Sequence, residues 1–259
     1  MAEPATGLRI GLQERTARAV PAEPGHDERV GGWWLRHAPG CSWWVGSVLP
    51  HGGSSRAELA ERIEAAEAYS AARGIPTLIQ MTPGAAPAEL DAMLAARGYK
   101  RQASVSLQTA TTAGVLASAP HGSAADGPLR VRLTERPTPE WFEVWHGVAG
   151  GESEPQRRLL QRVSERSAYA GVLLGGETVA VGRAVAEDGW AGVFGMATLP
   201  AARGKGAAGA VLAALADWAA ANAAARMYLQ VEHENAGAFR LYGRLGFSEL
   251  CAFSFRVRQ

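Results

Sequence analysis

The ten residues from Pro200 to Gly209, PAARGKGAAG, combine the residue types that bind an anion. An arginine, a lysine and three glycines lie between an apolar run that reads as a strand and an alanine-rich run that reads as a helix. A helix N-terminus leaves backbone N–H groups unpaired and carries partial positive charge, and glycine lets a ligand approach the backbone closely. The loop therefore predicts a phosphate-binding turn to which Arg203 and Lys205 add positive charge.

Two common phosphate-binding motifs do not describe this loop. The Walker pattern needs a hydroxyl residue directly after its lysine, whereas Lys205 lies between two glycines. The dinucleotide pattern GxGxxG needs an acidic residue for the ribose, and none fits here. A basic, glycine-rich turn on a solvated surface is the alternative interpretation, so the residues around the loop have to decide.

A second group of residues follows one helix later, in YLQVEHENAGAFRLYGRLGF. In this stretch Asn235 is followed seven residues later by Tyr242 and then by Gly246-Phe247. Together with MATLPAARGKGAAGAVLAAL, this segment resembles the GNAT superfamily of acyl-coenzyme A dependent N-acyltransferases. The resemblance is strong across residues 129–259, because two motifs occur in order and at the right separation.

The loop itself satisfies the pattern of that family, which has Gln or Arg, two residues, Gly, one residue, and then Gly or Ala. Arg203, Gly206 and Ala208 occupy these positions. The resemblance implies acetyl-coenzyme A as co-substrate, with its pyrophosphate on the loop amides and its pantetheine arm paired to a strand end like an added strand. The residues that it assigns to the coenzyme are Met196, Ala197, Thr198, Arg203, Gly204, Lys205, Gly206, Ala207, Ala208, Gly209 and Asn235.

Acetyl transfer to an amine needs a neutral amine, stabilisation of an oxyanion and a proton for the departing thiolate. Tyr242 matches the general acid of the family, and the amide of Ala197 or Thr198 is a candidate oxyanion donor. In the family, many members that acetylate protein α-amines carry a glutamate five residues before the motif asparagine, and this chain has Gln230 there, which cannot accept a proton at neutral pH. Glu232 lies two residues along the same strand and faces the same side, so it is the candidate base, with a solvated charge as the alternative.

The acceptor amine is predicted only in outline. In the family it meets the first helices and the loop between the last strands, which places residues 248–253 of this chain near it. Glutamate and tryptophan suit a cationic amine, although two tryptophans at helical spacing also fit a core stripe. The remaining candidates are Trp141, Glu143, Trp145, Glu152 and Glu154.

The spacing of the apolar residues and the positions of glycine and proline predict the helices and strands that hold these residues. After a stretch at 109–128 that is rich in Ala, Gly, Ser and Pro, helices are expected over 138–150, 152–167, 209–225 and 235–246. Strands are expected between and around them, at 129–133, 169–176, 177–185, 190–199, 226–232 and 247–257. Upstream, strands are expected at 32–39, 42–50, 75–83 and 99–108, with helices at 55–74 and 88–98.

The upstream half repeats the order of the downstream half. Pro50 falls opposite Pro200 and Gln80 opposite Gln230, each 150 residues apart (200 − 50; 230 − 80), while Gly98-Tyr99 falls opposite Gly246-Phe247. The upstream copy is degenerate, because HGGSSRAE stands where the basic loop is. We therefore predict a mixed α/β protein with a degenerate GNAT-like domain at 1–110, a linker at 111–128 and a catalytic domain at 129–259. The resemblance implies that each domain has a central mixed, mostly antiparallel sheet flanked by helices and splayed at the coenzyme site.

Composition limits the classes of partner. The net charge of +1 and the pI of about 7.9 indicate neither nucleic acid nor an anionic membrane. Two cysteines without metal-ligand spacing indicate no disulfide framework and no metal site, and no signal peptide or membrane span is evident. A cytoplasmic enzyme with a small-molecule amine acceptor is expected, and its oligomeric state is not predicted.

The leading hypothesis is an acetyl-coenzyme A dependent N-acetyltransferase that acts on a primary amine of a small or amino-acid-like acceptor by direct attack. An acetyltransferase similar to mycothiol synthase is a second possibility, prompted by the tandem arrangement. A non-catalytic module that binds acyl-coenzyme A is a third, because Gln230 replaces an acid.

Overall fold

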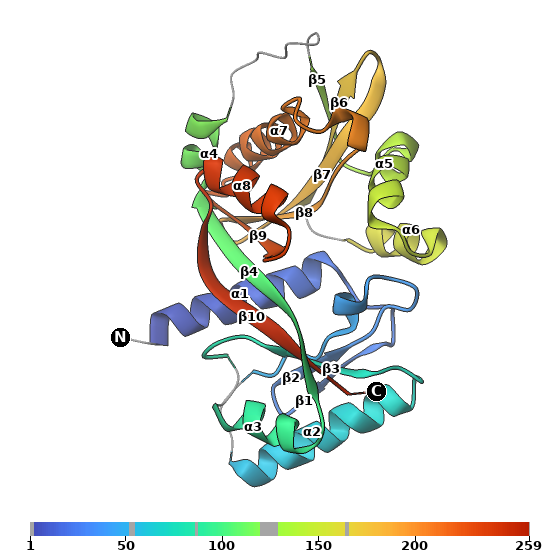
Figure 1. Cartoon of the computed structure of the whole chain (residues 1–259), viewed down its shortest axis with the longest axis vertical. Coiled ribbons are helices and arrows are strands. Elements are labelled where there is room, and N and C mark those ends of the chain that lie inside the picture. The colour runs from blue at the N-terminus through green and yellow to red at the C-terminus, as the bar shows by residue number, and fades with distance from the viewer. Residues whose placement is uncertain (1–2, 52–54, 86–87, 120–128, 164–165, 259) are drawn as a thin grey trace. The chain divides into compact units, whose positions relative to one another are not determined.

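The helices and strands of the computed structural model are described for residues 3–51, 55–85, 88–119, 129–163 and 166–258. They divide between two units, of which the first comprises residues 1–106 and 250–259 and the second residues 107–249 (Figure 1). The first unit contains α1 (Glu3–Ala19), β1 (Asp27–Val30), β2 (Trp33–Arg36), η1 (Trp43–Gly46), α2 (Arg56–Ala71), β3 (Thr77–Met81) and α3 (Ala88–Ala96). The second contains α4 (Thr112–Ser118), β5 (Arg130–Thr134), α5 (Pro139–Ala149), α6 (Ser153–Gln161), β6 (Arg166–Leu174), β7 (Glu177–Glu187), β8 (Trp190–Thr198), η2 (Pro200–Ala202), α7 (Ala207–Ala221), β9 (Arg226–Glu232) and α8 (Ala236–Arg244). Two strands run from one unit into the other, β4 (Lys100–Thr111) and β10 (Ser248–Arg258).

The sheet of the second unit has the strand order β9-β8-β7-β6-β5. Its neighbouring strands are antiparallel except for β8 and β9, which are parallel because α7 connects them. Helix α7 covers one face of this sheet, and α5 and α6 cover the other (Figure 1). The expected mixed, mostly antiparallel sheet flanked by helices is confirmed.

Small residues let α7 lie close to the sheet. A Cβ atom on Gly182 of β7 would lie 2.8 Å from Cγ1 of Val211 and would also collide with the sulfur of Met196. The core of this unit accordingly buries Val211 and Leu215 of α7 completely. Such close packing fixes the helix, and with it the loop that precedes the helix, against the sheet.

The first unit has a core of its own. Leu59 and Ile63 of α2 pack with Trp33 and Ile79, and all four side chains are fully buried. Helix α1 was not expected from the sequence. The buried guanidinium of Arg36 lies at its C-terminal end, where it donates a hydrogen bond to the carbonyl of Ala17 at 3.0 Å.

One expected strand of the first unit is wrong. Residues 42–50 form the short 3₁₀ helix η1 and two isolated bridges, one between Trp34 and Leu49 and one between Val48 and Ile79. The paired tryptophans of this segment favour a strand by propensity, but the turn of η1 buries Val45 instead of continuing a ladder. Tertiary packing overrides propensity here.

The predicted domain boundaries at 110 and 129 differ from the boundaries of the two units. In the strand order, β10 lies beside β3, and β4 lies beside β9. The repeat makes β3 equivalent to β9 and β4 equivalent to β10, so each copy receives its last strand from the other copy. The register of β10 on β3 runs antiparallel from Ser254↔Met81 to Arg258↔Thr77. Pairing at such sequence separation leaves no local signal in the chain.

The expected linker is partly helical. Thr111 caps α4, because its Oγ1 atom accepts a hydrogen bond from the N–H of Gly114 at 3.1 Å. Val115 of this helix is fully buried in the core of the second unit. We predicted a linker because the residues of this segment are small and polar. A capping threonine and one buried apolar residue are nevertheless enough to form a packed helix. The rest of the expected linker, at 120–128, lies outside the described residues.

Candidate acyl-coenzyme A site

Strands β8 and β9 separate part of the way along their length. Their pairing comprises Trp190↔Arg226, Ala191↔Met227 and Gly192↔Tyr228, although β8 continues to Thr198 and β9 to Glu232. Beyond Gly192, the edge of β8 that faces β9 therefore has no ladder partner on β9. An extended ligand with amide groups can pair with such an edge as an added strand. The expected splaying of the sheet is confirmed.

A bulge in β8 accompanies this separation. Val181 of β7 pairs with Ala197 and Arg183 pairs with Phe194, so two residues of β8 stand opposite Gly182. One of the two is Gly195, which has φ of +60°, a conformation that other residues rarely adopt. The bulge turns the backbone at the centre of the strand. A glycine inside an apolar strand was the signal in the sequence, and sequence reasoning missed it.

The glycine-rich loop follows β8 directly and opens α7. Gly204 and Gly206 both have left-handed φ, +77° and +81°, and a Cβ atom on either would meet nothing within 4 Å. Gly206 is the N-cap of α7, no side chain caps the helix, and its first turn contains no acidic residue. The first N–H groups of α7 thus have no side-chain acceptor, and the positive end of the helix dipole lies at a loop that a ligand can reach.

The basic residues of the loop lie on its exposed surface. Arg203 and Lys205 are exposed, and the Nε atom of Arg203 donates to the carbonyl of Thr198 at 3.4 Å. The structure therefore brings the predicted strand end at 196–198 and the predicted loop at 203–209 together around the start of α7. A diphosphate bound at the N-terminus of α7 would lie at the loop that carries both Arg203 and Lys205.

The equivalent helix of the first unit, α2, has a different N-terminus. The Oγ atom of Ser55 accepts from the N–H of Glu58 at 3.4 Å, and a carboxylate oxygen of Glu58 accepts from the N–H of Ser55 at 2.9 Å. This capping box satisfies two of the N–H groups that are uncapped in α7, and it places a negative charge there. The N-terminus of α2 is consequently unsuited to a phosphate.

Asn235 and Tyr242 lie on α8, which follows β9. Asn235 is the N-cap of α8, and its Oδ1 atom accepts from the N–H of Ala238 at 3.1 Å, so its amide nitrogen is the group that can donate to a ligand. Tyr242 is buried, 7% exposed, and its ring packs edge-on against Phe247 at 6.0 Å. Burial raises the pKa of Tyr242 to about 12, because the phenolate would lose its hydration. The phenol therefore keeps its proton throughout the physiological range.

The candidate base lies at the end of β9. Glu232 is exposed and Gln230 is partly buried. Beside them, Nε2 of His233 lies 2.9 Å from a carboxylate oxygen of Glu249, a pair that sequence reasoning did not anticipate. His233 lies in the turn after β9, and its ring packs against Phe239 of α8.

Two tryptophans of α5 have different roles. Trp141 is buried, and its indole N–H lies 3.1 Å from the carbonyls of both Ala170 and Gly182, so it belongs to the core. Trp145 is partly buried and lies over the bulge, because a Cβ atom on Gly195 would be 3.4 Å from its Nε1 atom. Cη2 of Trp141 would lie at the same 3.4 Å, so both tryptophans lie against the bulge, Trp141 from within the core and Trp145 at its partly exposed side. Glu143, Glu152 and Glu154 are exposed.

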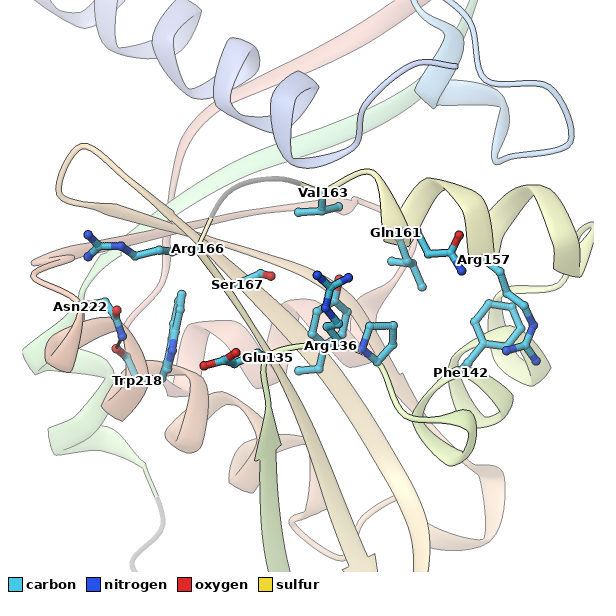
Figure 2. A pocket seen from close by; sticks show the side chains of 13 residues that line it. Glu135, Arg136, Phe142, Arg157, Gln161, Val163, Arg166, Ser167, Trp218 and Asn222 are labelled. Carbon is cyan, nitrogen blue, oxygen red and sulfur yellow. Dashed lines mark hydrogen bonds between the residues drawn. The ribbon is translucent and has the colours of Figure 1, made fainter. Parts of the chain in front are cut away.

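A pocket of about 670 Å³ lies elsewhere in the second unit. Figure 2 shows it at the end of β5 and the start of β6, with side chains from α5, α6 and α7 around it. Trp218 and Asn222, from the C-terminal end of α7, form part of its wall. Its lining residues are Glu135, Arg136, Pro137, Phe142, Arg157, Leu160, Gln161, Val163, Arg166, Ser167, Tyr169, Trp218 and Asn222.

The described residues contain neither a cluster of metal ligands nor a helix that could span a membrane. In that part of the chain, no three His, Cys, Asp or Glu side chains gather closely enough to hold a metal ion. Likewise, no helix within the described ranges has the length and apolar character to cross a membrane.

Comparisons with known proteins agree with this geometry. The family model described as "Probable histone acetyltransferase Rv0428c C-terminal" matches residues 11–253. The uncharacterized N-acetyltransferase YobR of Bacillus subtilis (strain 168) is 25% identical over 238 residues, which cover 89% of this chain and 91% of YobR.

Two solved structures share the fold at low sequence identity. A GCN5-related N-acetyltransferase from Kribbella flavida superposes with a TM-score of 0.71 at 18% identity, covering 96% of this chain and 94% of its own. A tandem GNAT protein from the clavulanic acid biosynthesis pathway superposes with a TM-score of 0.64 at 14% identity, covering 99% and 95%. The mixed fold and the tandem arrangement expected from the repeat are thereby confirmed.

Proposed function

This chain belongs to the family described as probable histone acetyltransferase Rv0428c C-terminal, within the GNAT N-acetyltransferases, and we propose that its second unit acetylates a primary amine. The acetyl donor is acetyl-coenzyme A, and the acceptor is a small or amino-acid-like molecule. The observation that carries the proposal is the continuity between the unpaired end of β8 and the uncapped N-terminus of α7. The unpaired end of β8 binds the amides of pantetheine, and the N-terminus of α7 binds the diphosphate.

The loop supplies most of the affinity for the coenzyme in this proposal. The amides of Gly204 to Gly209 surround the diphosphate, and Arg203 and Lys205 add charge to their field. Met196, Ala197 and Thr198 pair with the pantetheine amides on one side, and the free amide nitrogen of Asn235 donates from the other. These assignments use the residues that the sequence predicted.

Transfer then proceeds by direct attack. The neutral amine nitrogen bonds to the thioester carbonyl carbon, and the oxyanion that forms accepts a hydrogen bond from the amide of Ala197 or Thr198. Collapse of this intermediate breaks the C–S bond, and the departing sulfur takes a proton from the hydroxyl of Tyr242. The amine nitrogen gives up its proton to Glu232, directly or through water. The products are the N-acetyl amide and coenzyme A with a free thiol, and exchange with water returns the proton from Glu232 to the oxygen of Tyr242.

The environment of Tyr242 keeps its hydroxyl protonated, as the proposed role requires. Its raised pKa keeps the phenol protonated until the thiolate forms, so the proton is present in every turnover. The aromatic packing against Phe247 holds the ring in one position.

The first unit has no catalytic role in this proposal. Its helix α2 carries the Ser55–Glu58 capping box where a coenzyme diphosphate would have to bind. The unit has a core of its own, and its strand β4 continues into the second unit. Its role in this proposal is therefore structural.

A thiol-release assay tests the proposed function. The chain is incubated with acetyl-coenzyme A and a panel of amines that includes amino acids, polyamines and aminoglycosides, and free coenzyme A thiol is measured. Release that depends on one class of amine supports the enzyme. Coenzyme binding without release on any amine would contradict it in favour of a non-catalytic acyl-coenzyme A module.

A further inference from the structure

The pocket at the end of β5 lies apart from the proposed coenzyme site. Its volume of about 670 Å³ is within the usual range for a small-molecule site. Trp218 lines it and lies 11 residues (218 − 207) beyond Ala207, the first residue of α7, which is about 16 Å along the helix axis. None of the described residues that line the pocket belongs to the predicted acceptor set. The pocket is therefore a separate site from the loop that precedes α7.

Three arginine side chains line this pocket from three different segments. Arg136 follows β5, Arg157 belongs to α6 and Arg166 begins β6. Figure 2 shows them spread along the pocket, with Arg136 between the other two in that view. Glu135 is the one carboxylate among the described lining residues, so the formal charge of the lining is +2 (3 − 1). A hollow lined mainly by one sign of charge concentrates its field, and this one attracts anions.

The three arginines have no carboxylate partner in the part of the chain that the structure describes. Glu135 lines the same pocket and forms an ion pair with none of them. Arg158, the neighbour of Arg157 on α6, behaves differently, because its Nη1 atom lies 3.5 Å from a carboxylate oxygen of Glu154. Guanidinium groups that share a pocket repel one another, and an anion bound between them removes this repulsion.

The guanidinium of Arg157 is held in place before any ligand binds. Its central carbon lies 3.7 Å from the centroid of the ring of Phe142, a residue that is 3% exposed. A guanidinium that stacks on the face of a ring keeps the N–H groups at its edge for an oxyanion. Binding an anion therefore costs Arg157 little side-chain freedom.

The rest of the wall suits the carbon frame of an organic ligand. Leu160 and Val163 contribute apolar side chains, and Trp218 contributes an indole ring that is partly exposed. From the three arginines and these apolar side chains we infer that the pocket binds a small organic polyanion, with at least two carboxylate or phosphate groups on one compact frame. This inference does not rest on the proposed function, because none of its residues belongs to the glycine-rich loop, β8 or β9.

Titration calorimetry at low salt tests the pocket with two probes, benzene-1,3,5-tricarboxylate for carboxylates and fructose 1,6-bisphosphate for phosphates. At least one probe should bind the wild-type chain, and the tighter of the two identifies the kind of anion. Arg136→Gln and Arg157→Gln should each weaken its binding by at least about tenfold, because each removes a charge-assisted contact. Arg158→Gln is the matched control, since it makes the same change on α6 outside the pocket, and its affinity should stay within about twofold of wild type.

A further variant separates this pocket from the N-terminus of α7, which also attracts anions. Gly206→Asp should leave the affinity for the probe within about twofold, because Gly206 lies at the other end of α7 from the pocket. Binding that Gly206→Asp abolishes and that both pocket variants leave unchanged would place the anion at α7 and overturn the inference.

Other results would also overturn it. These are the binding of neither probe, equal affinities in wild type and in both folded pocket variants, and binding of inorganic phosphate as tight as that of the better probe. Circular dichroism shows whether the variants are folded. A chain that binds a probe in this way but transfers acetyl to no amine would retain this site while the proposed function fails.

Discussion

Replacing Gly206 by aspartate tests the assignment of the loop, because this residue caps the helix that receives the diphosphate. The site is open, with nothing within 4 Å of an added Cβ atom, so neither aspartate nor asparagine creates a clash there. The left-handed φ of +81° costs an ordinary side chain about 1–2 kcal/mol, and asparagine and aspartate tolerate it best. The Gly206→Asp and Gly206→Asn variants carry the same strain, so the difference between them isolates the charge.

The magnitude follows from electrostatics. Two unit charges 4 Å apart interact by about 4 kcal/mol near a protein surface, and solvent screening at an exposed loop reduces this to about half. A repulsion of about 2–4 kcal/mol corresponds to a loss of roughly 30-fold to 1000-fold in affinity. Gly206→Asp should therefore bind coenzyme A at least about 30-fold more weakly than Gly206→Asn.

Titration calorimetry with coenzyme A measures this difference at one salt concentration. Circular dichroism of both variants shows whether they fold equally. Higher salt should narrow the difference between them, because screening weakens the repulsion. Equal affinities in two folded variants would refute the placement of the diphosphate at α7.

Three further predictions concern the acid and the stability of the chain. Tyr242→Phe should lower kcat by roughly 100-fold or more while the dissociation constant of coenzyme A stays within about twofold, and an unchanged kcat would remove Tyr242 as the acid. Arg256→Lys should lower the free energy of unfolding by about 1–2 kcal/mol, as urea denaturation would show, because Arg256 binds Asp91 through two hydrogen bonds of 2.9 Å that lysine cannot reproduce together. Burial lowers the pKa of His51 below its usual value, so the unfolded chain takes up this proton at a higher pH than the folded chain does. The free energy of unfolding should therefore fall as the pH drops below about 6.5. A His51→Gln variant that loses none of this pH dependence would contradict the assignment.

Local signals predicted the elements of the second unit well. The threonine cap and early proline of α5 are in place, because Thr138 accepts from the N–H of Trp141 at 3.2 Å and Pro139 is the first helical residue. The alanine-rich run forms α7, and the loop before it has the left-handed glycines that its composition indicates. Each of these features depends on residues that are neighbours in the chain.

The features that escaped prediction depend on distant residues. The exchange of β4 and β10 depends on pairing such as Ser254↔Met81, which no local pattern encodes. The hydrogen bond from Arg36 to the C-terminal end of α1 joins a strand to a helix that is distant in the sequence. The segment at 42–50 forms η1 instead of a strand, because this turn buries Val45 in the core. Composition alone also could not separate the fully packed tryptophan, Trp141, from the partly exposed one, Trp145.

The measurement that tests the central claim most directly is titration of the wild-type chain with coenzyme A and, separately, with pantetheine, which lacks the diphosphate. The account predicts one coenzyme A per chain, because α7 is uncapped and α2 carries the Ser55–Glu58 capping box. It also predicts that pantetheine binds at least about 100-fold more weakly, since charge-assisted contacts at the helix N-terminus supply much of the affinity. Two coenzyme molecules per chain, equal affinities for the two ligands, or no binding of coenzyme A would contradict it.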